Sequence, residues 1–443
     1  MLKRIVIILL SLLAAIAVRA QESWTLEECI RYAEEHNIDV QKQALTTDRS
    51  RLALQEGRWA FVPSLSASSN YTASTGRVLD PTTYQFVQTN LTSNNSSSIS
   101  GDIILFEGGK KIHILEKAKL SLRASFLQEE SVKYNLRLNV VAAYMDVLCA
   151  AENVLIAEQS ASLVKAQLEH STVLLEAGDI TESDVLQLRT QLFAAQNDVA
   201  SARQSELIAK LSLCDLLEID DYESFKIVEP SDSEPLAGIV DIDVAIESHP
   251  DYQTAILNES LARSDLKIAR ATLYPRLSLS AGYGSSFSDA RKKSIVEPDG
   301  TLKYEAYPFL QQYADNSSAY VSIGLQIPIL TGFSARNSVK RAEIAQTEAQ
   351  FSTVAIRKDL RKKILQAQID CNSARDRYLR AREEVRYAEN AQRQIDEKYK
   401  LGVTDYLTWS TALVELAKAR YSEAEAKYTH LLTKTKLKLL YSN

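Results

Sequence analysis

The residue types that usually carry catalysis or bind metals are present in this chain, but their spacing forms no recognisable site. The five histidines show no H-E-x-x-H motif and no paired spacing that would hold a metal ion: His36, His113, His170, His249 and His430. The stretch EGGKK at 107–111 looks like part of a phosphate loop. However, Ile104 and Lys111 stand where the motif G-x-x-x-x-G-K-[ST] needs Gly and Ser or Thr. Neither G-x-G-x-x-G nor G-x-S-x-G occurs. The sequence therefore predicts no enzyme, no cofactor and no metal site.

The charged residues and the cysteines also point away from chemistry. Carboxylates such as Asp370, Asp376, Glu383 and Glu384 lie in Arg-rich stretches, which is typical of a solvated helix face. The four cysteines are far apart and show no C-x-x-C spacing, so we expect packed free thiols and neither disulfides nor a zinc site. With 51 basic and 57 acidic residues, and a net charge of −6, nucleic acid is not an expected partner.

The first 20 residues predict a secretory signal peptide. The basic start MLKR is followed by the apolar run 5–17 and by small residues at 18–20, so Gln21 would be the first mature residue. No cysteine follows the cleavage site, so the lipoprotein form of export is not indicated. No later uninterrupted apolar run reaches 18 residues. If the mature chain crosses a membrane, we therefore expect a β-barrel, the other structure that satisfies every backbone hydrogen bond in lipid.

The elements that would position any site are repeated within the chain. Gly108 and Gly332 are 224 residues apart, and Gly178 and Gly402 are separated by the same 224. FVPSLSAS at 61–68 matches LYPRLSLS at 273–280 at an offset of 212. A period near half the chain length indicates a tandem duplication of one large unit. We expect the copies to be 21–219 and 241–443, joined by an acidic, proline-containing linker at 220–240.

Each copy begins with a helical stretch, 25–61 or 241–273, that stops near a proline, Pro63 or Pro275. Alternation of apolar and small polar residues then predicts strands at about 64–74, 97–106, 276–287 and 319–330. This length and pattern fit a strand of a membrane barrel, but the alternation alone fits a half-buried strand of a soluble sandwich equally well. The long polar segments 75–97 and 288–318 favour the barrel, because extracellular loops of such barrels are long.

Beyond Gly108 and Gly332 the chain has neither proline nor glycine for a long distance. This predicts helices at 110–177 and 334–401, each roughly 100 Å long. In the second helix, apolar and small residues follow a 3.5-residue period from Leu360 to Tyr399, which indicates a coiled-coil seam. Gly178 and Gly402 would end these helices as C-caps, and second helices would return at 181–219 and 404–440.

This duplicated plan resembles the TolC-type outer-membrane factors, the exit ducts of bacterial efflux pumps and type I secretion systems. The motifs that carry the resemblance are WTLEECIRYAEEHN at 24–37 with its echo at 243–252, the junctions VPSLS and YPRLS, and the tips EAGDITESDVL at 176–186 and KLGVTDYLTW at 400–409. Each motif is loose, but together they cover essentially the whole mature chain. The implied fold is an α+β membrane protein in which each copy is a β-hairpin carried on a long coiled-coil hairpin.

Four strands per chain leave two unpaired edges, which lipid does not tolerate, so we expect partners. Three chains would close a 12-stranded barrel, and the resemblance implies that same homotrimer, continued by a periplasmic barrel of helices. It also implies outer-membrane lipid around the barrel, an inner-membrane transporter of RND or ABC type, and a periplasmic adaptor that contacts the tips at Gly178 and Gly402. The strand–helix junctions would lie at Pro63, Gly108, Pro275 and Gly332.

The resemblance also suggests where the channel entrance lies. In well-known members of the family, acidic residues six and nine positions after the second tip glycine ring the constricted entrance and favour cations. In this chain those positions hold Thr408 and Thr411, and the equivalent first-copy positions hold Asp184 and Gln187. Asp405 lies a turn before Thr408. Any cation preference would therefore have to come from Asp184 or Asp405, unless both are ordinary helix-start residues.

The function implied by the resemblance is an outer-membrane exit duct that passes small molecules, such as drugs or toxic compounds, out of the cell. An exit duct for type I protein secretion is the first alternative, because specificity lies largely in the inner-membrane transporter. The second alternative is a periplasmic trimeric coiled-coil scaffold with a soluble β cap. It would need strands whose apolar faces pack on each other.

Overall fold

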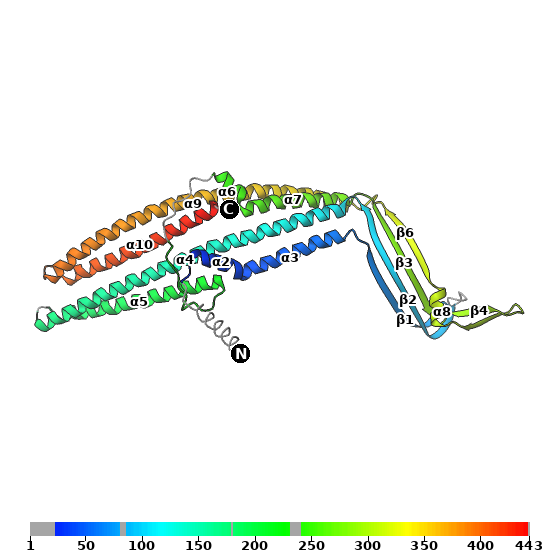
Figure 1. The fold of residues 1–443 in the computed structure, drawn as a ribbon, viewed down its shortest axis with the longest axis horizontal. Helices are drawn as coiled ribbons and strands as arrows, with labels where there is room; N and C mark the ends of the chain where they lie inside the picture. The colour runs from blue at the N-terminus through cyan, green and yellow to red at the C-terminus, as the bar shows by residue number, and fades with distance from the viewer. Residues whose placement is uncertain (1–22, 80–85, 179, 231–240, 442–443) are drawn as a thin grey trace, which may run out of the picture. The chain divides into compact units, whose positions relative to one another are not determined.

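The computed structural model of the chain describes residues 23–79, 86–178, 180–230 and 241–441 (Figure 1). The predicted signal peptide, Gln21 and part of the predicted linker lie outside the described residues. The chain divides into two units. Among the described residues, the sheet unit consists of those within Asp48–Ala124 and Leu257–Phe351, and the helical unit of those up to Thr47, within Ser125–Ile256 and from Ser352 onward.

The sheet unit is built on four antiparallel strands: β1 (Ser64–Leu79), β2 (Phe86–Glu107), β3 (Arg276–Ser288) and β6 (Ser318–Gln326). They pair in the order β1-β2-β3-β6, so the two copies of the repeat meet between β2 and β3 (Figure 1). β1 begins at Ser64 and β3 at Arg276, which is the 212-residue offset found in the sequence. One strand pair from each copy thus forms a continuous sheet with β1 and β6 as its outer strands.

The register of the strands gathers apolar residues on one face of the sheet. Ile99 of β2 pairs with Ala67 of β1 and with Tyr283 of β3. The opposite face carries small polar residues, such as Ser66 and Ser100, whose hydroxyl oxygens lie 3.2 Å apart. The apolar face is open, because 51% of Ile99 and 57% of Tyr283 are exposed. Such a face needs an apolar surrounding, which agrees with a membrane sheet.

Three strands differ in length from the prediction. The predicted loop 75–97 is largely strand, because β1 continues to Leu79 and β2 already begins at Phe86. From Thr89 to Ser97 the pairing residues of β2 are Ser, Thr and Asn, so the backbone ladder continues after the hydrophobic alternation has ended. The fourth strand ends at Gln326 and does not reach 330. Pro328 stands two residues later, and it has no N–H to donate to a ladder.

The second predicted loop, 288–318, contains regular structure. β4 (Lys292–Val296) and β5 (Leu302–Ala306) form a two-stranded hairpin, and α8 (Phe309–Asp315) is a short helix. The Gln312 side chain of α8 is fully buried, accepts a hydrogen bond from Ser288 N at 3.0 Å and donates one to Ser288 O at 2.9 Å. This amide ties α8 to the end of β3. It gave no signal in the sequence, because a single side chain has no period.

The helical unit contains two long helical hairpins. The first joins α4 (Lys110–Ala177) to α5 (Glu182–Leu217), and the second joins α9 (Ser334–Lys400) to α10 (Tyr406–Tyr441). Figure 1 shows the two helices of each hairpin running side by side. The predicted seam positions of α9, from Leu360 to Tyr399, are all buried or half-buried. The coiled-coil prediction is therefore confirmed.

The main core of the helical unit forms where α2 (Leu26–His36) packs against α4, α5 and the segment that follows α5. Tyr144 of α4 is fully buried, and its hydroxyl lies 2.9 Å from Trp24 O and 2.5 Å from Val228 O. α4 contains an 18-residue stretch that is apolar enough to cross a membrane, with 56% of it buried in the fold. This burial explains its composition, because a helix covered by neighbours needs an apolar surface.

Each predicted first helix is in fact two helices. In the first copy, α2 is followed by α3 (Ile38–Trp59), and in the second copy α6 (Ile242–Ser248) is followed by α7 (Pro250–Ala271). Asn37 separates the first pair, and its side chain accepts a hydrogen bond from Asp39 N at 3.0 Å. His249 separates the second pair, and its Nδ1 accepts one from Asp251 N at 3.2 Å. The counterpart of His249 in the first copy is therefore Asn37, at the 212-residue offset, and not the neighbouring His36.

His249 caps α7 as a neutral imidazole in a buried place. Only 3% of the residue is exposed, and its ring meets the Tyr134 ring edge-on with the centroids 5.1 Å apart. Burial lowers the pKa of His249, an effect that the nearby Asp251 carboxylate opposes and Lys363 reinforces. A protonated ring cannot accept the hydrogen bond from Asp251 N at Nδ1.

We predict that His249 makes the protein less stable in acid. Because its folded pKa lies below its unfolded value of about 6.5, its contribution is complete above that pH and is lost as the pH falls below it. His249→Asn copies the uncharged cap of the first repeat and should reduce the drop in the thermal unfolding midpoint between pH 7.5 and pH 5.5. An unchanged drop in this variant would show that other groups cause the acid sensitivity.

Candidate functional site

The predicted strand–helix junctions lie where the sheet meets the helices. Pro63 and Pro275 directly precede β1 and β3, and Gly108 and Gly332 stand just before α4 and α9. Both glycines have a positive φ, +64° for Gly108 and +58° for Gly332. A Cβ atom on Gly108 would lie 2.7 Å from Tyr274 Cβ and 2.8 Å from a backbone oxygen, whereas one on Gly332 would meet nothing within 4 Å. The two junctions thus share a backbone conformation and differ in packing.

The two hairpin tips have the same backbone conformation, a left-handed glycine at the end of the outgoing helix. Gly178 has a φ of +86° and its N–H donates to Leu175 O at 3.0 Å. Gly402 has a φ of +68° and its N–H donates to Tyr399 O at 3.0 Å. A left-handed glycine that closes the last helical turn is a common helix end. The structure therefore agrees with the predicted C-caps at both positions.

Beyond each tip glycine the returning helix is capped by a threonine and an aspartate whose positions are exchanged. In the first copy Thr181 is the N-cap of α5, its hydroxyl accepts from Asp184 N at 3.4 Å, and the Asp184 carboxylate accepts from Thr181 N at 3.1 Å. In the second copy the equivalent of Thr181 is Asp405, whose carboxylate accepts from Thr408 N at 2.9 Å. Both aspartates therefore serve as helix-start residues.

The structure pairs each acidic gate candidate with a threonine of its own tip. The side chain and the N–H of Thr408 both bond the Asp405 carboxylate and lower its pKa, so this carboxylate is ionised at neutral pH. Thr411 donates its hydroxyl to Leu407 O at 2.8 Å, a bond within α10, and Gln187 is exposed on α5. The proposed role of these residues at an entrance stays a prediction.

Near the tips, the structure shows contacts within and between the two hairpins that the sequence did not predict. The hydroxyl of Tyr406 on α10 donates to the Gln191 side chain of α5. Trp409 is 2% exposed, and its indole N–H donates to Asp396 Oδ1 at 3.2 Å. Its ring packs in a small core with Val164, Leu188 and Leu413. The signal that was available is the YLTW sequence, since aromatic side chains dominate packed contacts and a buried Tyr or Trp usually finds a hydrogen-bond partner.

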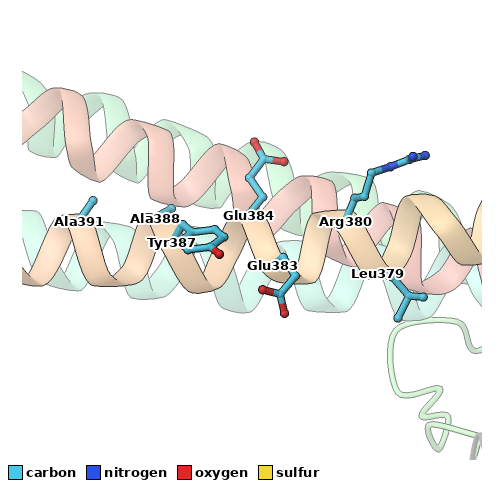
Figure 2. A pocket seen from close by; sticks show the side chains of 7 residues that line it. All are labelled: Leu379, Arg380, Glu383, Glu384, Tyr387, Ala388 and Ala391. Carbon is cyan, nitrogen blue, oxygen red and sulfur yellow. The ribbon is translucent and has the colours of Figure 1, made fainter.

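The outer surfaces of the hairpins carry apolar side chains that are exposed to solvent in a single copy of the chain. A shallow hollow on α9 is lined by residues of that helix alone: Leu379, Arg380, Glu383, Glu384, Tyr387, Ala388 and Ala391 (Figure 2). Leu379 is 47% exposed and Tyr387 65%. On α5, Leu186 and Phe193 are 52% and 68% exposed and lie one heptad apart. We call these two exposed apolar strips the α5 seam (Leu186 and Phe193) and the α9 seam (Leu379 and Tyr387). Exposed strips of this kind are typical of helices that contact another subunit.

Comparison with known proteins identifies the fold and the family. A family model described as outer membrane efflux protein matches residues 29–217 and 242–441. The chain is a member of the outer membrane efflux protein family. It is 21% identical to the outer membrane protein TolC of Escherichia coli (strain K12) over 417 residues, which covers 91% of this chain and 79% of TolC. It is 22% identical to the outer membrane efflux protein BepC of Brucella suis, with 73% of this chain and 67% of BepC covered.

The fold of the outer membrane efflux protein agrees with solved channels. Superposition on the CmeC outer membrane channel of Campylobacter jejuni gives a TM-score of 0.78 at 15% identity, covering 94% of this chain and 85% of CmeC. The family places the chain in the outer membrane, with a helical extension into the periplasm. In an outer-membrane barrel, an apolar face such as that of Ile99 and Tyr283 is the one expected to meet lipid, and a face of Ser and Gly the one expected to line the channel. The family thus favours the membrane duct over the soluble scaffold.

The two junction glycines of the efflux protein provide a matched pair for mutation. Gly332→Ala should cost about 1 kcal/mol, because only the left-handed backbone is strained. Gly108→Ala should cost about 3 kcal/mol, because the new methyl group also collides with Tyr274 and its neighbouring backbone. The thermal unfolding midpoint of the purified protein measures both. Equal losses in the two variants would contradict the packing assigned to Gly108.

Proposed function

We propose that three copies of this chain form the exit duct of a tripartite efflux pump that passes small molecules out of the cell. The observation that carries the proposal is the four-stranded sheet with β1 and β6 as outer strands. In lipid, an unpaired strand edge leaves N–H and C=O groups without partners, at several kcal/mol each. Pairing β6 of one copy with β1 of the next removes both edges, and three copies give a closed 12-stranded barrel.

The exposed helix surfaces support the same assembly. In Figure 1, α5 and α9 lie on the two outer sides of the paired hairpins of the helical unit. α5 exposes Leu186 and Phe193, and α9 exposes Leu379 and Tyr387. Contact between α5 of one copy and α9 of the next would bury both seams at once. The helices would then continue the closed ring that the strands begin.

The trimer can be tested at the centre of the α5 seam. Phe193→Asp places a charge on the seam and should reduce the trimer fraction of the detergent-purified protein, measured by native mass spectrometry. Ser205→Asp, at an exposed position about a third of a turn around the same helix from Phe193, adds the same charge outside the seam and should leave the trimer intact. Susceptibility of cells to pump substrates should rise only with the first variant. Loss of the trimer in both variants, or in neither, would contradict the assigned seam.

The substrate class and the partners follow from the family and from the tips. BepC is named as an efflux protein, which favours small-molecule efflux, and no feature of the described residues favours type I protein secretion instead. Around Gly402 the tip exposes three apolar side chains, Leu401 at 78%, Val403 at 72% and Leu407 at 70%. An apolar tip in the periplasm fits a protein partner. We assign it, with the Gly178 tip, to a periplasmic adaptor that links the duct to an inner-membrane transporter of RND or ABC type.

The entrance of the proposed duct would be closed mainly by packing. Tyr406, Gln191 and the Trp409 core tie the second hairpin to the first close to the tips. Arg420 adds a bond to Gln159 at 2.8 Å. Thr408 and Thr411 supply no charge at the positions where well-known relatives carry acidic residues. Adaptor contact would then open the entrance by repacking these helices, with Asp184, Gln187 and Asp405 contributing a weak electrostatic barrier.

This gate predicts a specific pattern of cation block in single-channel recordings of the purified trimer. A trivalent cation such as hexamminecobalt should block the unmodified channel weakly. Thr408→Asp combined with Thr411→Asp should strengthen the block, because it adds three copies of each carboxylate around one axis. Asp405→Asn keeps an N-cap acceptor for α10 and serves as the control for charge removal. Strong block that persists in Asp184→Asn and Asp405→Asn would contradict this account.

A further inference from the structure

The helix α8 lies on the apolar face of the sheet, at the end remote from the strand–helix junctions. Its Tyr313 hydroxyl is 2.9 Å from the Ser97 hydroxyl of β2, and Ser285 of β3 donates to Tyr313 O at 2.7 Å. Ser97 pairs with Ser285, two residues along from the pair Ile99–Tyr283. Because alternate residues of a strand share a face, α8 covers the same face that carries Ile99 and Tyr283. It is therefore on the lipid side of the sheet and outside the channel.

The part of this face that α8 covers is polar. Ser97 lies 2.8 Å from the Ser69 hydroxyl of β1, and the Asn95 side chain accepts a hydrogen bond from the Tyr313 hydroxyl. A bare cluster of hydroxyl and amide groups would be costly against acyl chains. α8 supplies partners for some of these groups and places aromatic rings over them. Phe309 packs on Phe287 with the ring centroids 5.0 Å apart.

The outward side of α8 is apolar. Phe309 is 46% exposed and Leu310 is 79% exposed, and Ala314, one turn after Leu310, is exposed as well. The opposite side is held to the sheet by Gln312, which has no exposed surface. The helix thus buries its polar anchor and presents hydrocarbon to its surroundings, the reverse of a helix that faces water.

The position along the strands identifies what surrounds this side. From Leu277 at the inner end of β3 to Ser285 is eight residues. At about 3.3 Å per residue and a tilt of about 40°, this spans roughly 20 Å of membrane thickness, close to the full height of about 25 Å of the apolar band. α8 therefore lies near the outer boundary of the hydrocarbon, where amphipathic helices rest in the plane of the interface.

We propose that α8 is an interfacial anchor whose Phe309 and Leu310 insert into the outer leaflet of the membrane. The apolar surface of α8 continues the lipid-facing surface of β2 and β3, which argues for lipid as its occupant. By covering the outermost polar groups of that face, α8 also sets the depth at which the barrel rests in the membrane. The proposal depends on the placement of the sheet across the membrane and is independent of what the duct transports.

Site-specific fluorescence in proteoliposomes tests the proposal. Leu310→Cys in the full-length protein is labelled with an environment-sensitive fluorophore and reconstituted in phosphatidylethanolamine and phosphatidylglycerol vesicles. The quencher is a lipid with a doxyl group near the headgroup end of its acyl chain. Burial raises the pKa of Cys29 to about 12 and that of Cys214 to about 11, so these native thiols react slowly, and the unmodified protein gives the background.

Two control positions separate the possible outcomes. Val321→Cys on the lipid face of β6, where 75% of the residue is exposed, reports whether the sheet is in the membrane. Leu302→Cys on β5, with 58% exposed, reports a surface in water. Quenching at 310 is expected to approach that at 321 and to exceed that at 302 several-fold. Quenching at 321 with none at 310 would overturn the anchor alone, and no quenching at 321 or 310 would overturn both the anchor and the membrane placement.

Discussion

The structure depends on one constraint, that every backbone N–H and C=O group inside lipid needs a hydrogen-bond partner. The described residues supply four strands to the membrane sheet, and β1 and β6 each have an outer edge. A single copy therefore cannot satisfy its own backbone in the membrane. In the proposed trimer, assembly and membrane insertion become one event, because the same step pairs the strand edges and buries the seams of α5 and α9. This coupling explains how helices that expose Phe193 and Tyr387 in one copy can form the periplasmic part of the protein.

The duplication repeats the requirements of the backbone, while the side chains that meet them vary. Both copies need a break between their first two helices, and Asn37 provides its cap in one copy and His249 in the other. Both copies also need a cap after the tip glycine, and the threonine and aspartate that form it are exchanged. Tandem copies can drift in this way because several residue types accept the same backbone hydrogen bond. A left-handed turn is less permissive, which is why glycine stands at both tips and both junctions.

The sequence was most informative where a period extends over many residues. The seam from Leu360 to Tyr399 and the alternation in 276–287 each combine many weak signals, and the helices and strands of the structure follow them. Elements without such a period were not predicted. The outer half of β2 pairs with β1 through Ser, Thr and Asn residues from Thr89 to Ser97, with no hydrophobic alternation to reveal it. α8 escaped notice for a related reason, because it is held by the single buried amide of Gln312.

The candidate entrance residues could be located from the sequence, but their partners could not. Counting from Gly402 found Thr408, Thr411 and Asp405, because a tip glycine fixes the register of the helix that follows. No count along the chain reveals that Asp405 bonds Thr408, or that Tyr406 reaches Gln191 of the other hairpin, 215 residues away. Contacts between elements depend on how those elements pack, and packing here follows from the coiled-coil seams of two separate hairpins.

These contacts also decide which force would hold the proposed entrance closed. Charges at exposed tips are screened over a Debye length of about 8 Å at physiological ionic strength, so the carboxylates of Asp184 and Asp405 attract cations only at short range. Packing is not screened. The Trp409 core and the Tyr406–Gln191 bond join neighbouring hairpins directly, and a trimer contains three copies of each.

Because the copies are related by symmetry, displacing one hairpin strains the seams on both of its sides, so the three sets of contacts would be released together. An adaptor that binds the apolar tip around Gly402 acts on the short loop next to these contacts. The free energy of adaptor binding would therefore offset the loss of the contacts that hold the hairpins together.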